Sequence, residues 1–468
     1  MSLKTKPSGI LTDREAEAGY KRNLSSRHIQ MIALGGAIGT GLFYGSSAAI
    51  QLAGPSILLA YLVGGTVVFL IVRALGEMSV AEPVSGAFSF YAYKHWNRRA
   101  GFVAGWNYWF TYIAVAMAEL AAVGEFVNYW LPGIPKWVTA AFFLVVITAT
   151  NLLSVKVFGE TEFWLSFIKV LAVVGMIVFG VVIVVLGLKT PSADVTPSFS
   201  HLFDQGGFFP NGVTGFLLAL VVVAFSFGGT ELVGVTAGEA EHPEKTIPKA
   251  INQVILRILI FYVGALAVIM AVIPWFTIDG SMSPFVQIFD TLGIASAAHI
   301  LNFVVIVAAA SVYNSSLYAN GRMLYTLSQQ GNAPTYLQKM SSSGQPWAAI
   351  LTSSIVTVAA VFVVMVWPDF AFTFLMGLAT FAVAASWFMI TMTEYKFRRG
   401  LTPGERAALK FKLPGGRAAT VLILAFLALL FVLMFFSPSF RLAAIIGPLW
   451  IAFLLVAYQV RQGISSRS

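Results

Sequence analysis

A series of apolar runs, each long enough to cross a lipid bilayer, limits the fold of this chain more than any other feature. A helix of about 20 apolar residues spans the hydrocarbon core. The chain has 468 residues, of which 58% are hydrophobic and only 10% are charged, whereas a soluble domain has about 25% charged residues. Too few charges remain to cover a globular surface, and no segment shows the alternation over about 10 residues that membrane β-barrels have. We therefore predict an all-α integral membrane protein.

Charged or Pro/Gly-rich breaks divide the sequence into twelve predicted transmembrane helices. Because residues 1–28 are polar, we expect no cleavable signal peptide, and the first span itself is expected to direct insertion. The approximate cores of the spans are residues 29–50, 56–78, 101–129, 136–154, 162–187, 213–236, 254–275, 295–321, 347–367, 370–393, 418–436 and 442–460.

Lysine and arginine are distributed unevenly between the two sides of the predicted membrane protein. The side with both termini carries 24 of these residues and the other side carries three, Lys136, Lys189 and Arg441, while Arg73 and Lys169 lie within spans. The positive-inside rule therefore places both termini in the cytoplasm. The net charge of +9 then reflects topology, with some contact to membrane lipids, and we expect no nucleic-acid partner.

The sequence offers little to a metal site or to enzymatic chemistry. It has no cysteine, and its five histidines, His28, His95, His201, His242 and His299, are scattered without metal-ligand spacing. A thiolate metal site, a cysteine nucleophile and an HExxH pair are therefore excluded. We expect no metal, no cofactor and no enzymatic activity.

Two of the predicted spans contain glycine clusters that weaken a helix. The first span has GGAIGTGLF at Gly35–Phe43, and the sixth has FSFGGTELVG at Phe225–Gly234, which includes the carboxylate Glu231. Glycine costs a helix interior about 1 kcal/mol relative to alanine, and unwound backbone at membrane depth is tolerated only where it lines a cavity. Glycines spaced four apart, as in the first cluster, also suit close helix packing. Because the two clusters lie five helices apart, at matching places in two five-helix halves, we predict that helices 1 and 6 are broken and form a binding site.

Longer stretches of the sequence resemble bacterial amino acid permeases of the amino acid–polyamine–cation superfamily, in its amino acid transporter family. They are NLSSRHIQMIALGGAIGTGLFYGS, AGPSILLAY, LGEMSVAEPVSGAFSFYA, GWNYWFTYIAVAMAELAAVG, VKVFGETEFW, SFGGTELVGVTAGEAEHPEKTIPKAINQV and SVYNSSLYANGRMLYTLSQQGNAP. The resemblance covers residues 22–460. It is strongest to the aromatic amino acid permeases, through WNYWFTYIAVAMAEL and FSFGGTELVG, whereas LKFKLPGG at Leu409–Gly416 is similar to proline- and histidine-type members.

This resemblance implies a LeuT-type fold, in which helices 1–5 and 6–10 form an inverted repeat and two further helices follow. It also implies proton-coupled uptake of an amino acid, aromatic or otherwise large and neutral, across the bacterial inner membrane. We expect a monomer or a weak oligomer. The corresponding segments are an N-terminal cytoplasmic tail (1–28), helices 1–5 (29–187), helices 6–10 (213–393), a cytoplasmic loop (394–417), helices 11 and 12 (418–460) and a C-terminal cytoplasmic tail (461–468).

An amino acid offers a carboxylate, an ammonium group and a side chain for recognition. In proteins of similar sequence, amides at the break in helix 1 bind the carboxylate, as expected from the positive end of a helix dipole, and carbonyls of helix 6 bind the ammonium group. Aromatic rings, among them Trp106 and Phe381, would contact the side chain, although core packing explains many such rings equally well. The residues expected at the substrate site are Ala37, Ile38, Gly39, Thr40, Gly41, Tyr108, Tyr112, Phe225, Ser226, Phe227, Gly228 and Gly229.

Ionisable residues within spans are costly and indicate function. Lys169 lies about nine residues, or about 13 Å, into its helix, where snorkelling to the membrane surface is one interpretation. In related permeases the matching lysine takes the place of a sodium ion, which implies a role in proton coupling. Glu119 and Glu231 are the other candidates for proton coupling, with a structural hydrogen-bonded pair as the alternative. Arg73 and Glu77, four residues apart, are predicted to form an ion pair.

Several other functions are alternatives to proton-coupled import. Within transport, the alternatives are a permease for proline, histidine or small neutral amino acids, and an amino acid exchanger. A membrane enzyme would require a catalytic cluster, and a nutrient sensor would usually have a larger soluble domain than the predicted tails provide. A channel requires neither two broken helices nor a buried lysine.

Overall fold

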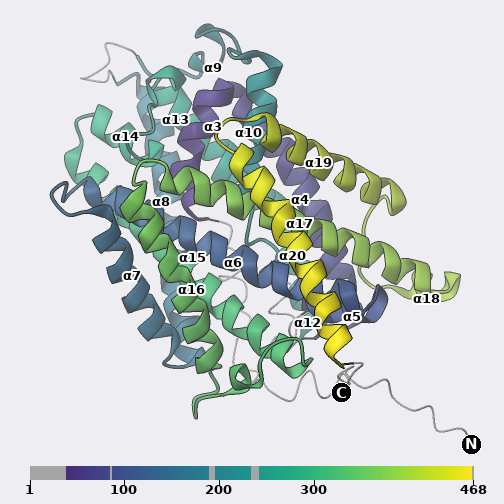
Figure 1. The fold of residues 1–468 in the computed structure, drawn as a ribbon. Coiled ribbons are helices and arrows are strands. Elements are labelled where there is room, and N and C mark those ends of the chain that lie inside the picture. The colour runs from purple at the N-terminus through teal and green to yellow at the C-terminus, as the bar shows by residue number, and fades with distance from the viewer. Residues whose placement is uncertain (1–37, 85–86, 189–195, 233–241, 466–468) are drawn as a thin grey trace, which may run out of the picture.

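The computed structural model describes residues 38–84, 87–188, 196–232 and 242–465. These residues form helices, and none of them lies in a β-strand, so the all-α prediction is confirmed over these ranges. Three long helices lie at the centre of the bundle, where α6 (Arg98–Asn128) packs against both α15 (Ala295–Gln329) and α17 (Ala371–Gly400) (Figure 1). The remaining helices surround this central group.

The helix ends in the first half of the chain follow local sequence signals. Asn97 and Ser154 lie just before α6 and α8, and their side chains accept hydrogen bonds from the first-turn amides at 2.8 and 3.2 Å, the usual role of an N-cap. Gly187 ends α8 with φ 58°, in the left-handed conformation that favours glycine. The elements of this half are η1 (Gly41–Gly45, a π-helical turn), α3 (Ser46–Ala53), η2 (Gly54–Ser56), α4 (Ile57–Ala81), α5 (Ala87–His95), α6, α7 (Lys136–Asn151) and α8 (Val155–Leu186).

In the second half, proline begins several helices because it fits the first helical turn, where its missing N–H would have no partner. Pro243, Pro284 and Pro403 occupy this position in α12, α14 and α18. The elements of this half are α9 (His201–Asp204), α10 (Gly212–Ser226), α12 (Pro243–Arg257), η4 (Ile258–Gly264), α13 (Ala265–Val272), η5 (Trp275–Thr277), α14 (Pro284–Thr291), α15, η6 (Thr335–Gln338), α16 (Trp347–Val366), α17, α18 (Pro403–Ala408), α19 (Arg417–Phe436) and α20 (Arg441–Ser465).

Each of the twelve predicted spans overlaps a helix in the described part of the chain. Nine helical segments there are long and apolar enough to cross a membrane, and the first of them, Gly41–Ala81, contains residues 41–50 of predicted span 1 and all of predicted span 2. Helices Lys136–Asn151 and Gly212–Ser226 are apolar but shorter. The second of these is short because the predicted sixth span stops being helical after Ser226.

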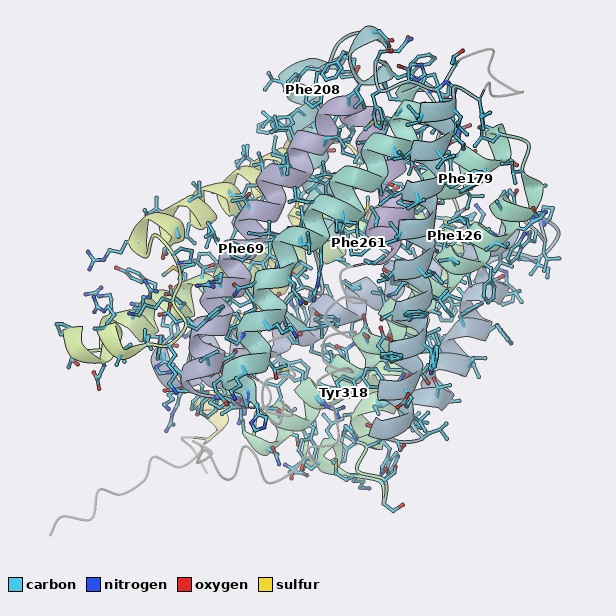
Figure 2. The ribbon with its side chains drawn as sticks, turned by 180° about the vertical axis from the view of Figure 1, so that it is seen from behind. Phe69, Phe126, Phe179, Phe208, Phe261 and Tyr318 are labelled. Carbon is cyan, nitrogen blue, oxygen red and sulfur yellow. The ribbon has the colours of Figure 1, made fainter. Side chains whose placement is uncertain are left out.

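Helix α8 has one exposed apolar face and one buried face that carries charged residues. Trp164 and Leu171 on one side are 58% and 61% exposed, whereas Glu162 and Lys169 on the other side are fully buried. Figure 2 shows Phe179 farther along the same helix, where its ring stacks on Phe289 with centroids 5.2 Å apart. An apolar face suits lipid, and charges at membrane depth require partners inside the protein. The face of α8 that carries Glu162 and Lys169 therefore belongs to the polar interior.

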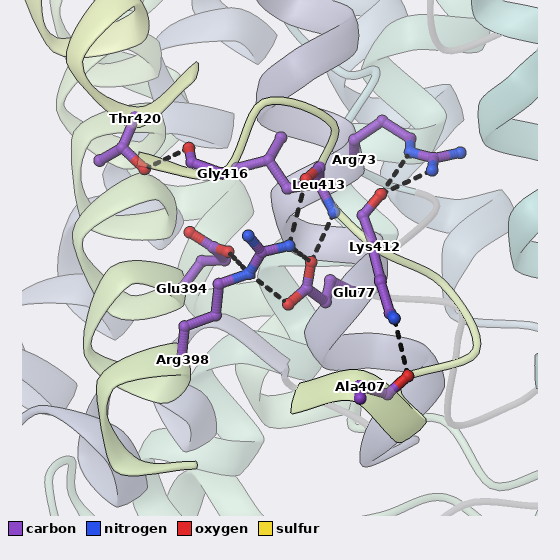
Figure 3. A network of polar contacts seen from close by, with 9 residues as sticks. All are labelled: Arg73, Glu77, Glu394, Arg398, Ala407, Lys412, Leu413, Gly416 and Thr420. Carbon is purple, nitrogen blue, oxygen red and sulfur yellow. Dashed lines mark hydrogen bonds and ion pairs between the residues drawn. The ribbon is translucent and has the colours of Figure 1, made fainter. Parts of the chain in front are cut away.

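The predicted ion pair between Arg73 and Glu77 on α4 is wrong. Glu77 is fully buried, pairs through both carboxylate oxygens with the Arg398 guanidinium of α17, and accepts a further hydrogen bond from the Leu413 amide at 2.5 Å (Figure 3). Arg73 donates instead to the Lys412 carbonyl at 2.6 Å. A bidentate guanidinium–carboxylate pair is stronger than a contact between helix neighbours, and it holds the loop before α19 against α4 and α17.

Candidate functional site

In the first glycine cluster, the described part of the chain begins just before a helix. Ile38 and Gly39 form a bend, the helix begins at Thr40, and η1 continues it as a π-helical turn. The carbonyl of Gly39 accepts from the amides of both Leu42 and Phe43 at 3.1 Å. The first amides of a helix have no intrahelical acceptor, so this turn can present N–H groups to a ligand. Ala37, also expected here, lies outside the described residues.

The second glycine cluster ends a helix, as predicted for the break in span 6. Helix α10 stops at Ser226, and the chain continues through tight turns from Phe227 to Glu231. The amides of Gly228 and Thr230 donate to carbonyls three residues earlier, at 2.9 and 3.3 Å. Gly229 has φ 98°, a conformation that side chains other than glycine's rarely adopt. The glycine here is required by the backbone conformation itself.

The two breaks lie against each other. A Cβ atom on Gly41 would lie 2.5 Å from the Cα of Ser226, closer than real Cβ atoms approach another heavy atom. A Cβ atom on Gly39 would lie 2.8 Å from Val312 on α15 and 3.2 Å from the Glu119 carboxylate. The small residues therefore allow the two glycine clusters to pack closely at one place.

A small cavity lies where the two glycine clusters meet. The space between its lining atoms is about 260 Å³, but the centre of a water molecule can occupy only about 10 Å³ of it, enough for about one water. A ligand larger than a water molecule can therefore enter only if the surrounding helices separate. The cavity is lined by Gly39, Gly41, Val115, Glu119, Phe225, Ser226, Gly228 and Val312.

The carbonyl groups expected to bind an ammonium group already take part in hydrogen bonds. The Phe225 carbonyl accepts from the Gly228 amide at 2.9 Å, and the Ser226 carbonyl accepts from the Tyr262 hydroxyl at 2.9 Å. The Phe227 carbonyl accepts from both the amide and the hydroxyl of Thr230. Since a carbonyl oxygen has two lone pairs, the carbonyls of Phe225 and Ser226 can each accept one more hydrogen bond, and that of Phe227 is already fully used.

Glu119 on α6 brings a carboxylate into this cavity. Its Oε1 accepts from the Thr40 hydroxyl at 2.9 Å, which links α6 to the break in helix 1. Its Oε2 is buried and has no hydrogen-bond partner among the described residues. An unpaired buried carboxylate oxygen is costly, so this atom is available to a proton or to a cationic ligand.

Glu231 lies at the other end of the break in helix 6 and is held by two aromatic residues. The Tyr112 hydroxyl donates to its Oε1 at 3.3 Å, and the Trp387 indole N–H donates to its Oε2 at 3.4 Å. Tyr108, one turn before Tyr112 on α6, packs edge-on against it with ring centroids 4.8 Å apart. The structure therefore joins the predicted residues Tyr108, Tyr112 and Glu231 in one buried group.

Lys169 on α8 lies in a buried polar cluster that also includes residues not predicted from the sequence. Its Nζ donates to the Ser311 hydroxyl of α15 at 2.9 Å, and the Ser311 hydroxyl donates to Glu162 Oε1 at 2.5 Å. Asn314 donates to Glu162 Oε2 at 3.2 Å. Glu162 and Lys169 are seven residues apart, which is about two helical turns and therefore the same face. That spacing was the signal in the sequence that could have identified Glu162.

Only some of the aromatic residues expected around the substrate lie at the cavity. Phe225 lines the cavity, whereas the Phe227 ring lies between those of Tyr61 and Tyr262 at 5.7 and 4.9 Å. Trp106 donates its indole N–H to the Asn332 carbonyl in the loop after α15. Phe381 packs against Gly447 of α20 and Phe431 of α19. Trp106 and Phe381 thus do not belong to the wall of this cavity.

The described ranges bring together no group of three His, Asp or Glu residues that could hold a metal ion.

Comparison with known proteins identifies the family to which this chain belongs. The family model for amino acid permeases matches residues 28–464. The aromatic amino acid transport protein AroP of Escherichia coli (strain K12) is 49% identical over 442 residues, covering 94% of this chain and 96% of the relative. AroP of Salmonella typhimurium (strain LT2) is 48% identical over 444 residues, with the same coverage. The amino acid permease YtnA of Bacillus subtilis is 45% identical over 437 residues, covering 93% and 94%. The similar proteins are transporters and not enzymes, and the chain belongs to the amino acid permease family.

Proposed function

We propose that this protein is a secondary transporter that imports aromatic amino acids, or other large neutral amino acids, across the bacterial inner membrane together with protons. The observation that carries this proposal is the meeting of two broken helices at a buried cavity that contains the carboxylate of Glu119. Broken helices at matching positions are the usual site of substrate binding in transporters built from repeats. The relatives named as aromatic amino acid transport proteins support the choice of substrate.

The substrate carboxylate would bind at the helix start formed by Ile38, Gly39, Thr40 and Gly41, and Ala37 is proposed to take part from the sequence alone. The ammonium group would bind the free lone pairs of the Phe225 and Ser226 carbonyls, beside Gly228 and Gly229. The side chain would then lie along the Phe225 ring toward Tyr108 and Tyr112. Opposite partial charges at the two breaks favour the zwitterion in this orientation.

Proton coupling is assigned to Lys169, Glu119 and Glu231, which are ionisable groups buried in the interior of the described helices. A neutral Lys169 loses its charge-assisted hydrogen bond to Ser311, so its protonation state would change how firmly α8 is held to α15. Glu119 contacts the break in helix 1 directly through Thr40. Changes of charge at these positions would therefore alter the packing that closes the cavity.

The overall arrangement proposed is that of the LeuT-type transporters. Residues 29–187 and 213–393 form the inverted repeat of helices 1–5 and 6–10, and residues 418–460 form helices 11 and 12. All twelve helices cross the membrane, and both tails and the loop 394–417 lie in the cytoplasm. The helices found at each of the twelve predicted spans support this arrangement, and so does the distribution of basic residues.

The stretch Leu409–Gly416, which resembles proline- and histidine-type members, does not bear on the substrate. It packs against α4 and α17 through Glu77, Arg73 and Arg398 (Figure 3) and contributes no residue to the cavity. The aromatic substrate is supported instead by the relatives named as aromatic amino acid transport proteins.

Uptake into proteoliposomes tests this function. Radiolabelled phenylalanine should enter in a saturable way, accumulate when an inward proton gradient is imposed, and be displaced by tyrosine and tryptophan among the twenty amino acids. Absence of saturable uptake for every amino acid would remove the transporter assignment. Competition by proline or histidine alone would instead overturn the aromatic substrate, and uptake that requires an amino acid on the opposite side would favour an exchanger.

A further inference from the structure

We propose that Ser311 is a proton relay between Lys169 and Glu162, and that Glu162 is the group that takes the proton from Lys169 during transport. This extends the proton coupling proposed above and rests on it. Neither Ser311 nor Glu162 contacts the substrate cavity, so both are positioning and proton-transfer residues of the transport cycle and not binding residues.

The geometry of the three side chains suits a relay. Lys169 Nζ donates to Ser311 Oγ at 2.9 Å, and Ser311 Oγ donates to Glu162 Oε1 at 2.5 Å. The hydroxyl thus accepts from the ammonium group and donates to the carboxylate, which is the orientation a transfer in that direction requires. All three residues are fully buried, so bulk water does not compete for these bonds.

The proposed step is balanced without any further reactant. One N–H bond of the Lys169 ammonium group breaks as an O–H bond forms on Ser311, and the original O–H bond of Ser311 breaks as an O–H bond forms on Glu162. The products are a neutral amine, an intact hydroxyl and a neutral carboxylic acid. Burial disfavours separated charges, so the ion pair and the neutral pair lie closer in energy than they would in water.

Two further hydrogen-bond donors stabilise the charged form of Glu162 before the transfer. Ser166 donates to Oε1 at 3.3 Å, and Asn314 donates to Oε2 at 3.2 Å. Asn314 is in turn held by the side chain of Asn151 at the end of α7, at 2.7 Å. The carboxylate therefore connects α8, α15 and α7. Glu119 is the second carboxylate that acts electrostatically on Lys169, and it lies at the cavity.

The relay is adjacent to the break in helix 1. Val312, which follows Ser311 on α15, lines the cavity and lies against Gly39, where a Cβ atom would come within 2.8 Å of its Cγ2. A shift of α15 that lengthens the Lys169–Ser311 contact would therefore also move a wall of the substrate site. Movement of α15 would therefore affect substrate binding and proton transfer together.

The test compares serine variants in proteoliposomes. Ser311→Ala removes the relay hydroxyl but leaves both charges, and Ser311→Thr restores a hydroxyl. Ser316→Ala is the matched control, because Ser316 is fully buried on the same helix and donates only to the Val312 carbonyl, at 2.7 Å. Glu162→Gln removes the proton acceptor while keeping the shape of the side chain.

Two activities are measured for each variant, namely accumulation driven by a proton gradient and exchange of internal for external phenylalanine without a gradient. We expect Ser311→Ala and Glu162→Gln to lower driven accumulation by about tenfold or more, since loss of a positioned proton-transfer group costs about 10²–10⁴ in rate where that transfer limits it. Exchange should stay within about threefold of wild type, because the loaded carrier can still change conformation. Ser311→Thr and Ser316→Ala should accumulate phenylalanine like wild type.

Three outcomes would overturn the relay. Normal driven accumulation in both Ser311→Ala and Glu162→Gln would show that the proton takes another route. Equal loss of exchange and accumulation would assign the two residues a purely structural role. If Ser311→Thr did not restore driven accumulation, the hydroxyl group would not be the feature that transfers the proton. A failure of the proposed function itself is distinguishable, because wild-type protein would then show no dependence on the proton gradient at all.

Discussion

Replacing Gly41 by alanine tests directly whether the two breaks must touch. The new Cβ would lie 2.5 Å from the Cα of Ser226, where ordinary contact begins at 3.4 Å. The neighbour is backbone and not a flexible side chain, so the two helices must separate by about 0.9 Å, the difference between these two distances. Overpacking of this kind costs about 1–3 kcal/mol.

Closing the helices around bound substrate would have to restore the contact between Gly41 and Ser226, so a cost of about 1–3 kcal/mol in that state corresponds to about a 5- to 150-fold loss of affinity, at about tenfold for each 1.4 kcal/mol. We expect Gly41→Ala to weaken phenylalanine binding within that range, measured by scintillation proximity on purified protein. Its thermal unfolding in detergent should be recorded in parallel, so that a loss of fold is separated from a loss of affinity.

Gly45→Ala is the matched control in the same π-helical turn. Its Cβ would meet Val222 at 3.4 Å and Met376 at 3.6 Å, which is ordinary contact, so affinity should remain within about twofold of wild type, a change of about 0.4 kcal/mol. The reasoning would be refuted if Gly41→Ala bound phenylalanine like wild type, or if Gly45→Ala lost as much affinity as Gly41→Ala.

Three further predictions concern charged residues. Lys169→Met should abolish accumulation against a gradient while phenylalanine exchange survives, and accumulation at the wild-type level would contradict a coupling role. Glu119→Gln keeps an acceptor for the Thr40 hydroxyl but removes the charge, so proton uptake on adding phenylalanine, followed with a pH-sensitive dye, should fall; an unchanged signal would exclude Glu119 as a proton carrier. Arg398→Met leaves Glu77 buried without its partner, which costs about 3–5 kcal/mol, and should lower the melting temperature in detergent, whereas the exposed Arg399→Met should not.

The end of α10 at Ser226 was predictable because it depends on local residue type. Gly229 requires a positive φ, and the loss of helix after Ser226 follows from the glycine pair beside it. The apolar runs likewise predicted where helices form, because the lengths and compositions that suit a bilayer are properties of each segment alone.

The partners of the charged residues were less predictable. Arg73 and Glu77 are neighbours on one helix, and the sequence favoured pairing them. Glu77 pairs instead with Arg398, 321 positions away, because the fold brings a second guanidinium to it in bidentate geometry. Trp106 and Phe381 show the same limit, since ring type does not reveal which helix face points to the cavity.

For this protein, the sequence by itself determined the membrane-spanning class, the positions of the helices, the two glycine breaks and the buried lysine. Each of these follows from composition or spacing within about 20 residues. Only the tertiary structure decided that Gly41 meets Ser226, that Glu119 reaches Thr40, and that Ser311 lies between Lys169 and Glu162. These contacts join helices far apart in the chain, and they depend on packing in which a shift of about 1 Å changes which polar atoms can form hydrogen bonds.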